Sequence, residues 1–133
     1  GIGAALVSVP GSSAYFEGSV VAYSYDIKET LLGVDHLTLV EKGAVSDEIV
    51  RQMAEGARQK LGVDFAVAVS GIAGPDGGTP DKPVGTSYIS VAGPLRTTVE
   101  KFVFGKVRER NIQKTIFAAL NLLVKEVEDY PQG

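Results

Sequence analysis

Residues 46–85 read SDEIVRQMAEGARQKLGVDFAVAVSGIAGPDGGTPDKPVG, and they hold the signals for a helix, a strand and a long loop in succession. Ser46 is a favourable N-cap, and the acidic pair Asp47 and Glu48 follows in the first turn, where the helix dipole favours negative charge. Gly62 is a typical residue to end the helix. Between these signals, apolar residues recur on one helical face: Ile49, Val50, Met53, Ala54, Ala57 and Leu61.

The second half of this stretch predicts a buried strand followed by a long loop. Residues 65–69, Phe-Ala-Val-Ala-Val, form a short apolar run after a helix, which is typical of a central strand. The loop over residues 70–85 is dense in glycine and proline, and loops of this length inside a compact domain are usually functional or disordered.

The flanking sequence extends this pattern in both directions. Residues 19–25 are rich in valine and tyrosine and predict a strand, after which Asp26 can cap a short helix that ends at Gly33. Residues 86–92 and 97–104 predict two adjacent strands, and residues 109–128 predict a long amphipathic helix. Helices alternating with strands indicate an α/β fold, layered around a mixed sheet.

Composition excludes several classes of function. The 133 residues carry a formal net charge of -3, so no basic field attracts nucleic acid or an anionic membrane. Cysteine is absent and His36 is the single histidine, which excludes thiol chemistry and histidine-rich metal sites. No apolar run approaches the roughly 20 residues that span a bilayer. We therefore expect a cytoplasmic domain, and the sequence contains no credible cluster of metal ligands.

Four groups of residues could carry chemistry, and each also has a plain structural reading. Ser12 and Ser13 lie in a small-residue turn that could expose a nucleophilic hydroxyl or simply cap the backbone. Lys28 could act as a base if burial lowers its pKa, with Tyr23 sharing the proton; otherwise Tyr23 packs on the core and Lys28 is solvated.

The glycine-rich loop and the start of the last helix could bind an anion. Residues 70–74 follow the carboxyl end of a strand, where ligands bind in open α/β sheets, and glycines allow close approach of backbone N–H groups. Arg108 or Arg110 near the helix start would suit the same anion, whereas surface turns and solvated arginines are the alternative. The loop residues are Ser70, Gly71, Ile72, Ala73 and Gly74.

Taken together, the segments resemble one family: the C-terminal domain of the competence/damage-inducible protein CinA, also known as nicotinamide-nucleotide amidohydrolase. The matching stretches occur in family order over nearly the whole chain. They are VPGSSAYF (9–16), VVAYS (20–24) with Lys28 and LGV (32–34), GAVS (43–46), SGIAGPDGG (70–78) and KPVGT (82–86).

The resemblance implies a single three-layer α/β/α domain over residues 1–133 that hydrolyses nicotinamide mononucleotide to nicotinic acid mononucleotide and ammonia, as part of NAD salvage. It implies catalysis by Ser13 as nucleophile with Tyr23 and Lys28 beside it. Substrate contacts would come from Ser12, from residues 70–74 and from Arg108, or from Arg110 if the family spacing differs here.

The family also carries a Glu-Ser-x-Thr-Gly-Gly motif, with a helix and a strand, ahead of the position matched by Gly1. We therefore expect the domain to lack that strand and helix. The resemblance further implies a homodimer with nicotinamide mononucleotide as the small-molecule partner, and no nucleic-acid or membrane partner. The alternative function is a non-catalytic nucleotide-binding or regulatory module of a larger CinA-like protein.

Overall fold

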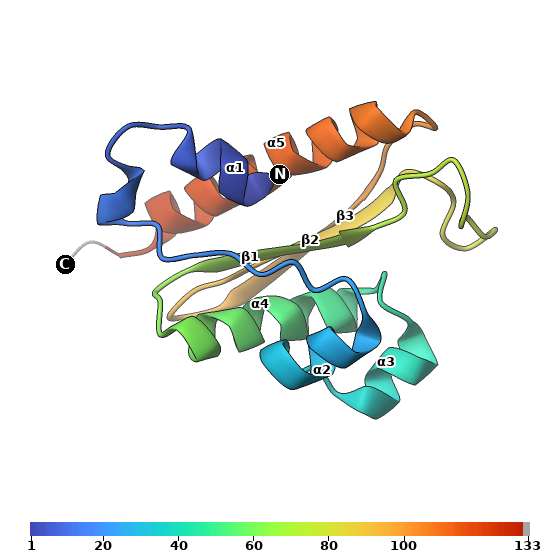
Figure 1. Ribbon diagram of the computed structural model, residues 1–133, viewed down its shortest axis with the longest axis horizontal. Coiled ribbons are helices and arrows are strands. Elements are labelled where there is room, and N and C mark those ends of the chain that lie inside the picture. The colour runs from blue at the N-terminus through green and yellow to red at the C-terminus, as the bar shows by residue number, and fades with distance from the viewer. Residues whose placement is uncertain (132–133) are drawn as a thin grey trace.

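The computed structural model describes residues 1–131, which fold into three layers with one sheet between two layers of helices (Figure 1). Helices α1 and α5 cover one face of the sheet, and α2, α3 and α4 lie on the other. This layering confirms the expected α/β/α fold. The elements are α1 (Ile2–Val7), the 3-10 helix η1 (Ser12–Ala14), α2 (Tyr25–Leu32), α3 (His36–Lys42), α4 (Asp47–Leu61), β1 (Ala66–Gly71), β2 (Thr86–Ala92), β3 (Thr97–Val103) and α5 (Arg108–Asp129).

The sheet of the described chain has the order β1-β2-β3 and is antiparallel throughout, whereas a mixed sheet was expected. Ala66 pairs with Ala92, and Thr86 pairs with Val103. The connections after β1 and after β2 contain no crossover helix, and strands joined directly by a loop pair antiparallel. Consequently β2 is the central strand, and the prediction of a central position for residues 65–69 is wrong because β1 lies at an edge.

Helix α4 forms as its sequence signals predict. The Ser46 hydroxyl accepts a hydrogen bond from the Ile49 N–H at 3.3 Å, and Gly62 adopts a left-handed φ of 63° at the C-terminus. The apolar face packs against the sheet and α2, and Ile49 and Val50 are fully buried there. Ser90 on β2 also donates from its hydroxyl to the Val50 carbonyl at 2.6 Å, which fixes α4 over the central strand.

The strand expected over residues 19–25 does not form. Residues 17–23, called the extended segment below, form no backbone–backbone hydrogen bond with any other residue of the described chain. Their β-branched and aromatic composition favours extended backbone, but a ladder also needs a neighbouring strand within hydrogen-bonding distance. The helix that follows begins at Tyr25, and its cap is Ser24, whose hydroxyl accepts from the Ile27 N–H at 3.1 Å, in place of the expected Asp26.

Helix α5 crosses the opposite face of the sheet and is anchored near its C-terminal end by a buried carboxylate. Glu126 accepts hydrogen bonds from Arg96 Nε at 3.0 Å and Nη2 at 2.6 Å, and also from the Thr98 hydroxyl. This pairing joins α5 to the turn between β2 and β3.

None of the helices within residues 1–131 combines the length and the apolar character that crossing a bilayer requires.

Candidate active site

A cleft of about 1100 Å³ lies along the free edge of β1. One wall is β1 itself, the facing wall is the extended segment, and both helix layers contribute to it, through Met53 of α4 and Ile116 of α5. The cleft therefore continues the plane of the sheet beyond its edge strand. At the carboxyl end of β1, its lining includes residues 70–73, together with Ala22, Tyr23 and Asn111.

The glycine-rich loop is held at this end of the cleft by side chains from α5. Arg108 donates from Nη1 to the Gly74 carbonyl at 2.9 Å, which places the predicted anion-binding arginine against the predicted anion-binding loop. Gly74 has a φ of 93°, and a Cβ there would lie 2.5 Å from Val84 Cγ1, so glycine is required at this position. No contact of this kind joins Arg110 to the loop among the described residues.

Asn111 is a second anchor of this loop, and the sequence analysis did not identify it. Its side chain is almost fully buried; Nδ2 donates to the Ala73 carbonyl at 3.0 Å and to the Gly105 carbonyl at 2.9 Å. Its Oδ1 accepts from the Gly105 N–H at 3.1 Å. An asparagine inside an amphipathic helix, on the face that meets the sheet, is the signal that could have found it, because buried amides are kept for their hydrogen bonds.

Lys28 is buried, with 6% of its surface exposed. Its Nζ donates to the Ala22 carbonyl at 2.6 Å and to the Tyr23 carbonyl at 3.4 Å, and none of the ion pairs within the described chain includes it. Burial lowers the pKa of this ammonium from its ordinary value of 10.5, because a low-dielectric environment disfavours the charged form. The alternative reading of Lys28 as a solvated residue is therefore excluded.

Tyr23 lies next to Lys28 through its backbone, while its side chain points away from the core. Tyr23 is 93% exposed, so the alternative in which it packs on the core is excluded. The contact with Lys28 is made by the Tyr23 carbonyl, not by the phenol. Tyr23 thus lines the cleft together with residues 70–73, whereas Lys28 is not among the lining residues and meets this end of the cleft through the carbonyls of Ala22 and Tyr23.

Ser13 lies at the other end of that segment. It belongs to η1, where Ser12 is buried and Ser13 is exposed, and neither serine lines the cleft. In Figure 1 the chain leaves η1 at the left of the view, crosses in front of β1 and enters α2 at the right. An extended chain rises about 3.3 Å per residue, so the extended segment alone separates Ser13 from Lys28 by roughly 20 Å. One chain by itself does not place the serine hydroxyl beside the lysine amine.

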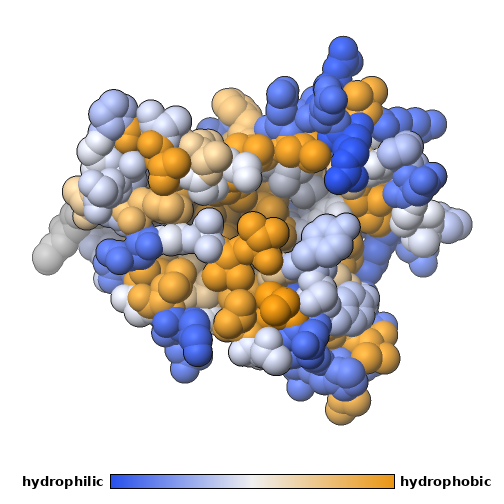
Figure 2. Space-filling view, viewed as in Figure 1, coloured by the Kyte–Doolittle hydropathy of each residue, from blue (hydrophilic) through white to orange (hydrophobic). Residues whose placement is uncertain are grey.

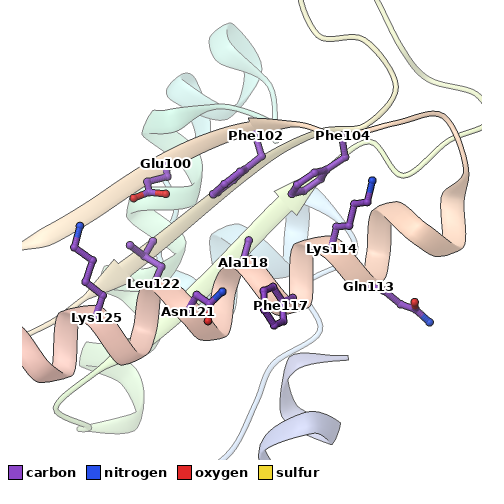
Figure 3. Close-up of a pocket in the computed structure, with 10 residues that line it drawn as sticks. All are labelled: Glu100, Phe102, Phe104, Gln113, Lys114, Phe117, Ala118, Asn121, Leu122 and Lys125. Carbon is purple, nitrogen blue, oxygen red and sulfur yellow. The ribbon is translucent and has the colours of Figure 1, made fainter.

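A second hollow, of about 690 Å³, lies between β3 and α5 and contains none of the predicted site residues. Figure 3 shows the ring of Phe102 in β3 and the ring of Phe104 just after β3, with Lys114 and Lys125 on α5. The two rings are stacked with centroids 5.4 Å apart.

Within residues 1–131, no group of three or more histidine, aspartate or glutamate side chains is placed to hold a metal ion. The polar, loop-lined end of the cleft is therefore the candidate active site.

Comparison with known proteins identifies the same family over almost all of the sequence. The family model of the CinA C-terminal domain matches residues 1–127. A CinA-like protein of Parasynechococcus marenigrum (strain WH8102) is 52% identical over 125 residues, which are 92% of this chain and 30% of that protein. A CinA-like protein of Prochlorococcus marinus (strain MIT 9313) is 54% identical over 110 residues, 83% of this chain and 26% of that protein. The chain thus spans less than a third of the length of these relatives.

Solved structures share the fold. The competence/damage inducible protein CihA from Agrobacterium tumefaciens superposes with a TM-score of 0.91 at 37% identity, covering 93% of this chain and 76% of that one. The competence damage-inducible protein A (ComA) from Klebsiella pneumoniae subsp. pneumoniae MGH 78578 gives a TM-score of 0.92 at 31% identity, covering 98% of this chain and 81% of that one.

Proposed function

The chain belongs to the CinA C-terminal domain family, and from this premise we propose that it hydrolyses the carboxamide of nicotinamide mononucleotide to nicotinic acid mononucleotide and ammonia. The observation that carries the proposal is the environment of Lys28. A lysine that is buried, is held only by carbonyls and has a lowered pKa has the properties of a general base. A lysine kept for stability would instead be exposed or paired with a carboxylate.

The proposed reaction uses a serine nucleophile. The reaction requires that Ser13 be brought to Lys28; the neutral amine of Lys28 then takes the Ser13 hydroxyl proton as the oxygen attacks the carboxamide carbon, which gives a tetrahedral intermediate. The carbon–nitrogen bond then breaks, the proton passes from Lys28 to the departing nitrogen, and ammonia leaves. Water hydrolyses the resulting ester, which releases nicotinic acid mononucleotide and restores Ser13. Tyr23, next to Lys28, is the second group proposed to assist this proton transfer.

The glycine-rich loop and Arg108 are proposed to bind the nucleotide. One guanidinium nitrogen of Arg108 is bonded to Gly74, and the exposed side chain leaves its other donors open to a phosphate. Backbone N–H groups of the loop, whose position Asn111 fixes, supply further donors. Ser12 and residues 70–74 complete the proposed substrate contacts. The proposed chemistry requires no metal and no organic cofactor.

The cleft supports a further part of the proposal, namely that the domain is completed by an additional extended segment. The free edge of β1 presents unpaired backbone groups, and the cleft lies in the plane of the sheet between both helix layers. A strand with the Glu-Ser-x-Thr-Gly-Gly motif of the family would pair with that edge. Activity is therefore best measured on the full-length protein.

The test is ammonia release from nicotinamide mononucleotide by the full-length protein and its variants. Ser13→Ala is expected to abolish turnover while nucleotide binding, measured by calorimetry, persists. Lys28→Met is expected to lower the rate by roughly 10²-fold or more, whereas Lys60→Met, at an exposed position of α4, should leave it unchanged. In the wild type the rate should rise with pH through the lowered pKa of Lys28, and this dependence should vanish in Lys28→Met.

The separation of Ser13 from Lys28 within one chain favours a second candidate, a nucleotide-binding or regulatory module without catalysis. This alternative predicts binding of nicotinamide mononucleotide by the folded wild type with no ammonia release. Binding that is lost in Arg108→Ala, together with absent turnover, would replace the amidase proposal with this one.

A further inference from the structure

We propose that the hollow between β3 and α5, called the β3–α5 hollow below, binds a nucleoside monophosphate, with the base against its phenylalanine rings and the phosphate on Lys114. This site is separate from the candidate active site, and the inference does not rest on the proposed function. The cleft borders β1, whereas β3 is the opposite edge of the sheet. In the space-filling view, apolar side chains gather in the middle of the face that the extended segment crosses, and that segment is a wall of the cleft, not of the hollow (Figure 2).

The floor of the β3–α5 hollow is aromatic and preformed. The hollow arises because α5 packs on β1 and β2 far more than on β3. Phe102 packs against the buried cluster that contains Ile89 and Leu122. The ring of Phe104 stacks on that of Phe102 with an angle of 12° between the ring planes. The volume of about 690 Å³ lies within the range of small-molecule sites, roughly 300–1,000 Å³, which are mostly apolar and hold a few polar groups.

On the α5 side of the hollow, an exposed aromatic ring lies between two amides. Phe117 is 68% exposed, and a large apolar side chain beside a ready-made hollow is costly to leave in water. Gln113 and Asn121 also line the hollow and lie four residues before and after Phe117, so the three side chains are neighbours on one face of the helix. Aromatic rings stack on nucleobases, and side-chain amides hydrogen-bond to base edges. This combination therefore fits a nucleobase.

The charges of the hollow select an anion at one end. Lys114 and Lys125 both line it, and no ion pair within residues 1–131 includes either of them. Glu100 lines the hollow as well. The start of β3 lies at the C-terminal end of α5, because the Thr98 hydroxyl donates to Glu126. Glu100 is therefore on the Lys125 side and offsets that charge, whereas Lys114, at the other end, is free to attract a phosphate.

Two larger occupants of the hollow fit the chain less well. An added peptide strand would have to pair with the free edge of β3, but the adjacent charges Glu100 and Lys101 in the middle of this strand protect the edge from pairing. A nucleic-acid strand would meet a chain of net charge -3. A single nucleotide needs only the local charge of Lys114.

Calorimetric titration of the full-length protein with adenosine 5′-monophosphate tests the site. All variants are made in an Arg108→Ala background, which removes the nucleotide binding proposed for the cleft. Lys114→Met and Phe117→Ala are each expected to weaken binding about tenfold, because the first removes a charge-assisted contact and the second removes base stacking. Both side chains are exposed, so the variants should melt at the temperature of the parent protein.

Two matched substitutions outside the hollow serve as controls. Lys101 lies on the opposite face of β3, where its Nζ is 5.7 Å from the centre of the Tyr88 ring, and Lys101→Met should bind as the parent does. Leu95→Ala, at an exposed apolar position in the turn after β2, should do the same. Adenosine and ribose 5-phosphate each lack half of the ligand and should bind at least about tenfold more weakly than the nucleotide.

Three results would overturn the proposal. They are no binding of adenosine 5′-monophosphate by the folded protein, an affinity that neither Lys114→Met nor Phe117→Ala changes, and equal affinities for ribose 5-phosphate and the nucleotide. Ammonia release from nicotinamide mononucleotide is a separate measurement on the protein with Arg108 intact. A protein that releases no ammonia but binds adenosine 5′-monophosphate through Lys114 and Phe117 would refute the amidase proposal alone.

Discussion

Gly56 allows α4 to pack closely against α2, and replacing it with alanine should destabilise the protein even though alanine is the better helix former. Gly56 lies inside α4 against the C-terminal end of α2. A Cβ at this position would lie 1.7 Å from the Leu32 carbonyl oxygen and 2.7 Å from its carbonyl carbon. Both atoms belong to the backbone, so no side-chain rotation relieves the contact.

The magnitude follows from two opposing effects. Within a helix, glycine to alanine gains about 1 kcal/mol from helix propensity. To reach the 3.0 Å that real Cβ contacts respect, however, the two helices must part by about 1.3 Å, which opens the packing around the buried Leu32. Overpacking and lost contact of this kind cost about 3 kcal/mol, so the net loss is about 2 kcal/mol.

Urea and thermal unfolding measure this change. A loss of about 2 kcal/mol corresponds to a fall in Tm of roughly 6–10 °C for a domain of this size. Two variants at the exposed Gln59 of the same helix are the controls: Gln59→Ala should lie within about 0.5 kcal/mol of the wild type, and Gln59→Gly should cost about 1 kcal/mol. A Gly56→Ala protein as stable as Gln59→Ala would show that the close approach of α2 and α4 is absent, and would refute the reasoning.

Two further predictions concern the buried polar groups of α5. Hydrogen bonding to Arg96 lowers the pKa of the Glu126 carboxyl from its ordinary value of 4.5. The stability that this ionised group contributes is therefore present above the unfolded pKa and is lost as the pH falls through the lower folded pKa. Glu126→Gln should therefore destabilise the protein by about 1 kcal/mol at pH 7 and should flatten the acid limb of melts between pH 7 and 3; an unchanged slope would contradict this. Asn111→Ala removes the clamp on the Ala73 and Gly105 carbonyls and should cost about 2 kcal/mol, speed hydrogen exchange in residues 70–85, and raise KM more than it lowers kcat. A loop with wild-type exchange protection in this variant would show that Asn111 does not hold it.

The sequence determined those parts of the protein that depend on residues close together in the chain. Ser46, the apolar spacing after it and Gly62 predict α4, because capping and helical periodicity act within a few residues. The two strands around the turn at Gly93 are predicted by the same kind of local pattern. The family motifs identify the family, which the comparisons confirm.

Only the tertiary structure decided which of these pieces meet. Residues 19–25 have strand composition but form no ladder, because pairing depends on a neighbour that local sequence does not supply. The burial of Lys28 and the anchoring of the loop by Asn111 arise from contacts between distant segments. The distance between Ser13 and Lys28 is set by the path of the chain across the sheet. Motif spacing along the sequence identifies the candidate residues of a site, but the positions of their side chains depend on long-range packing.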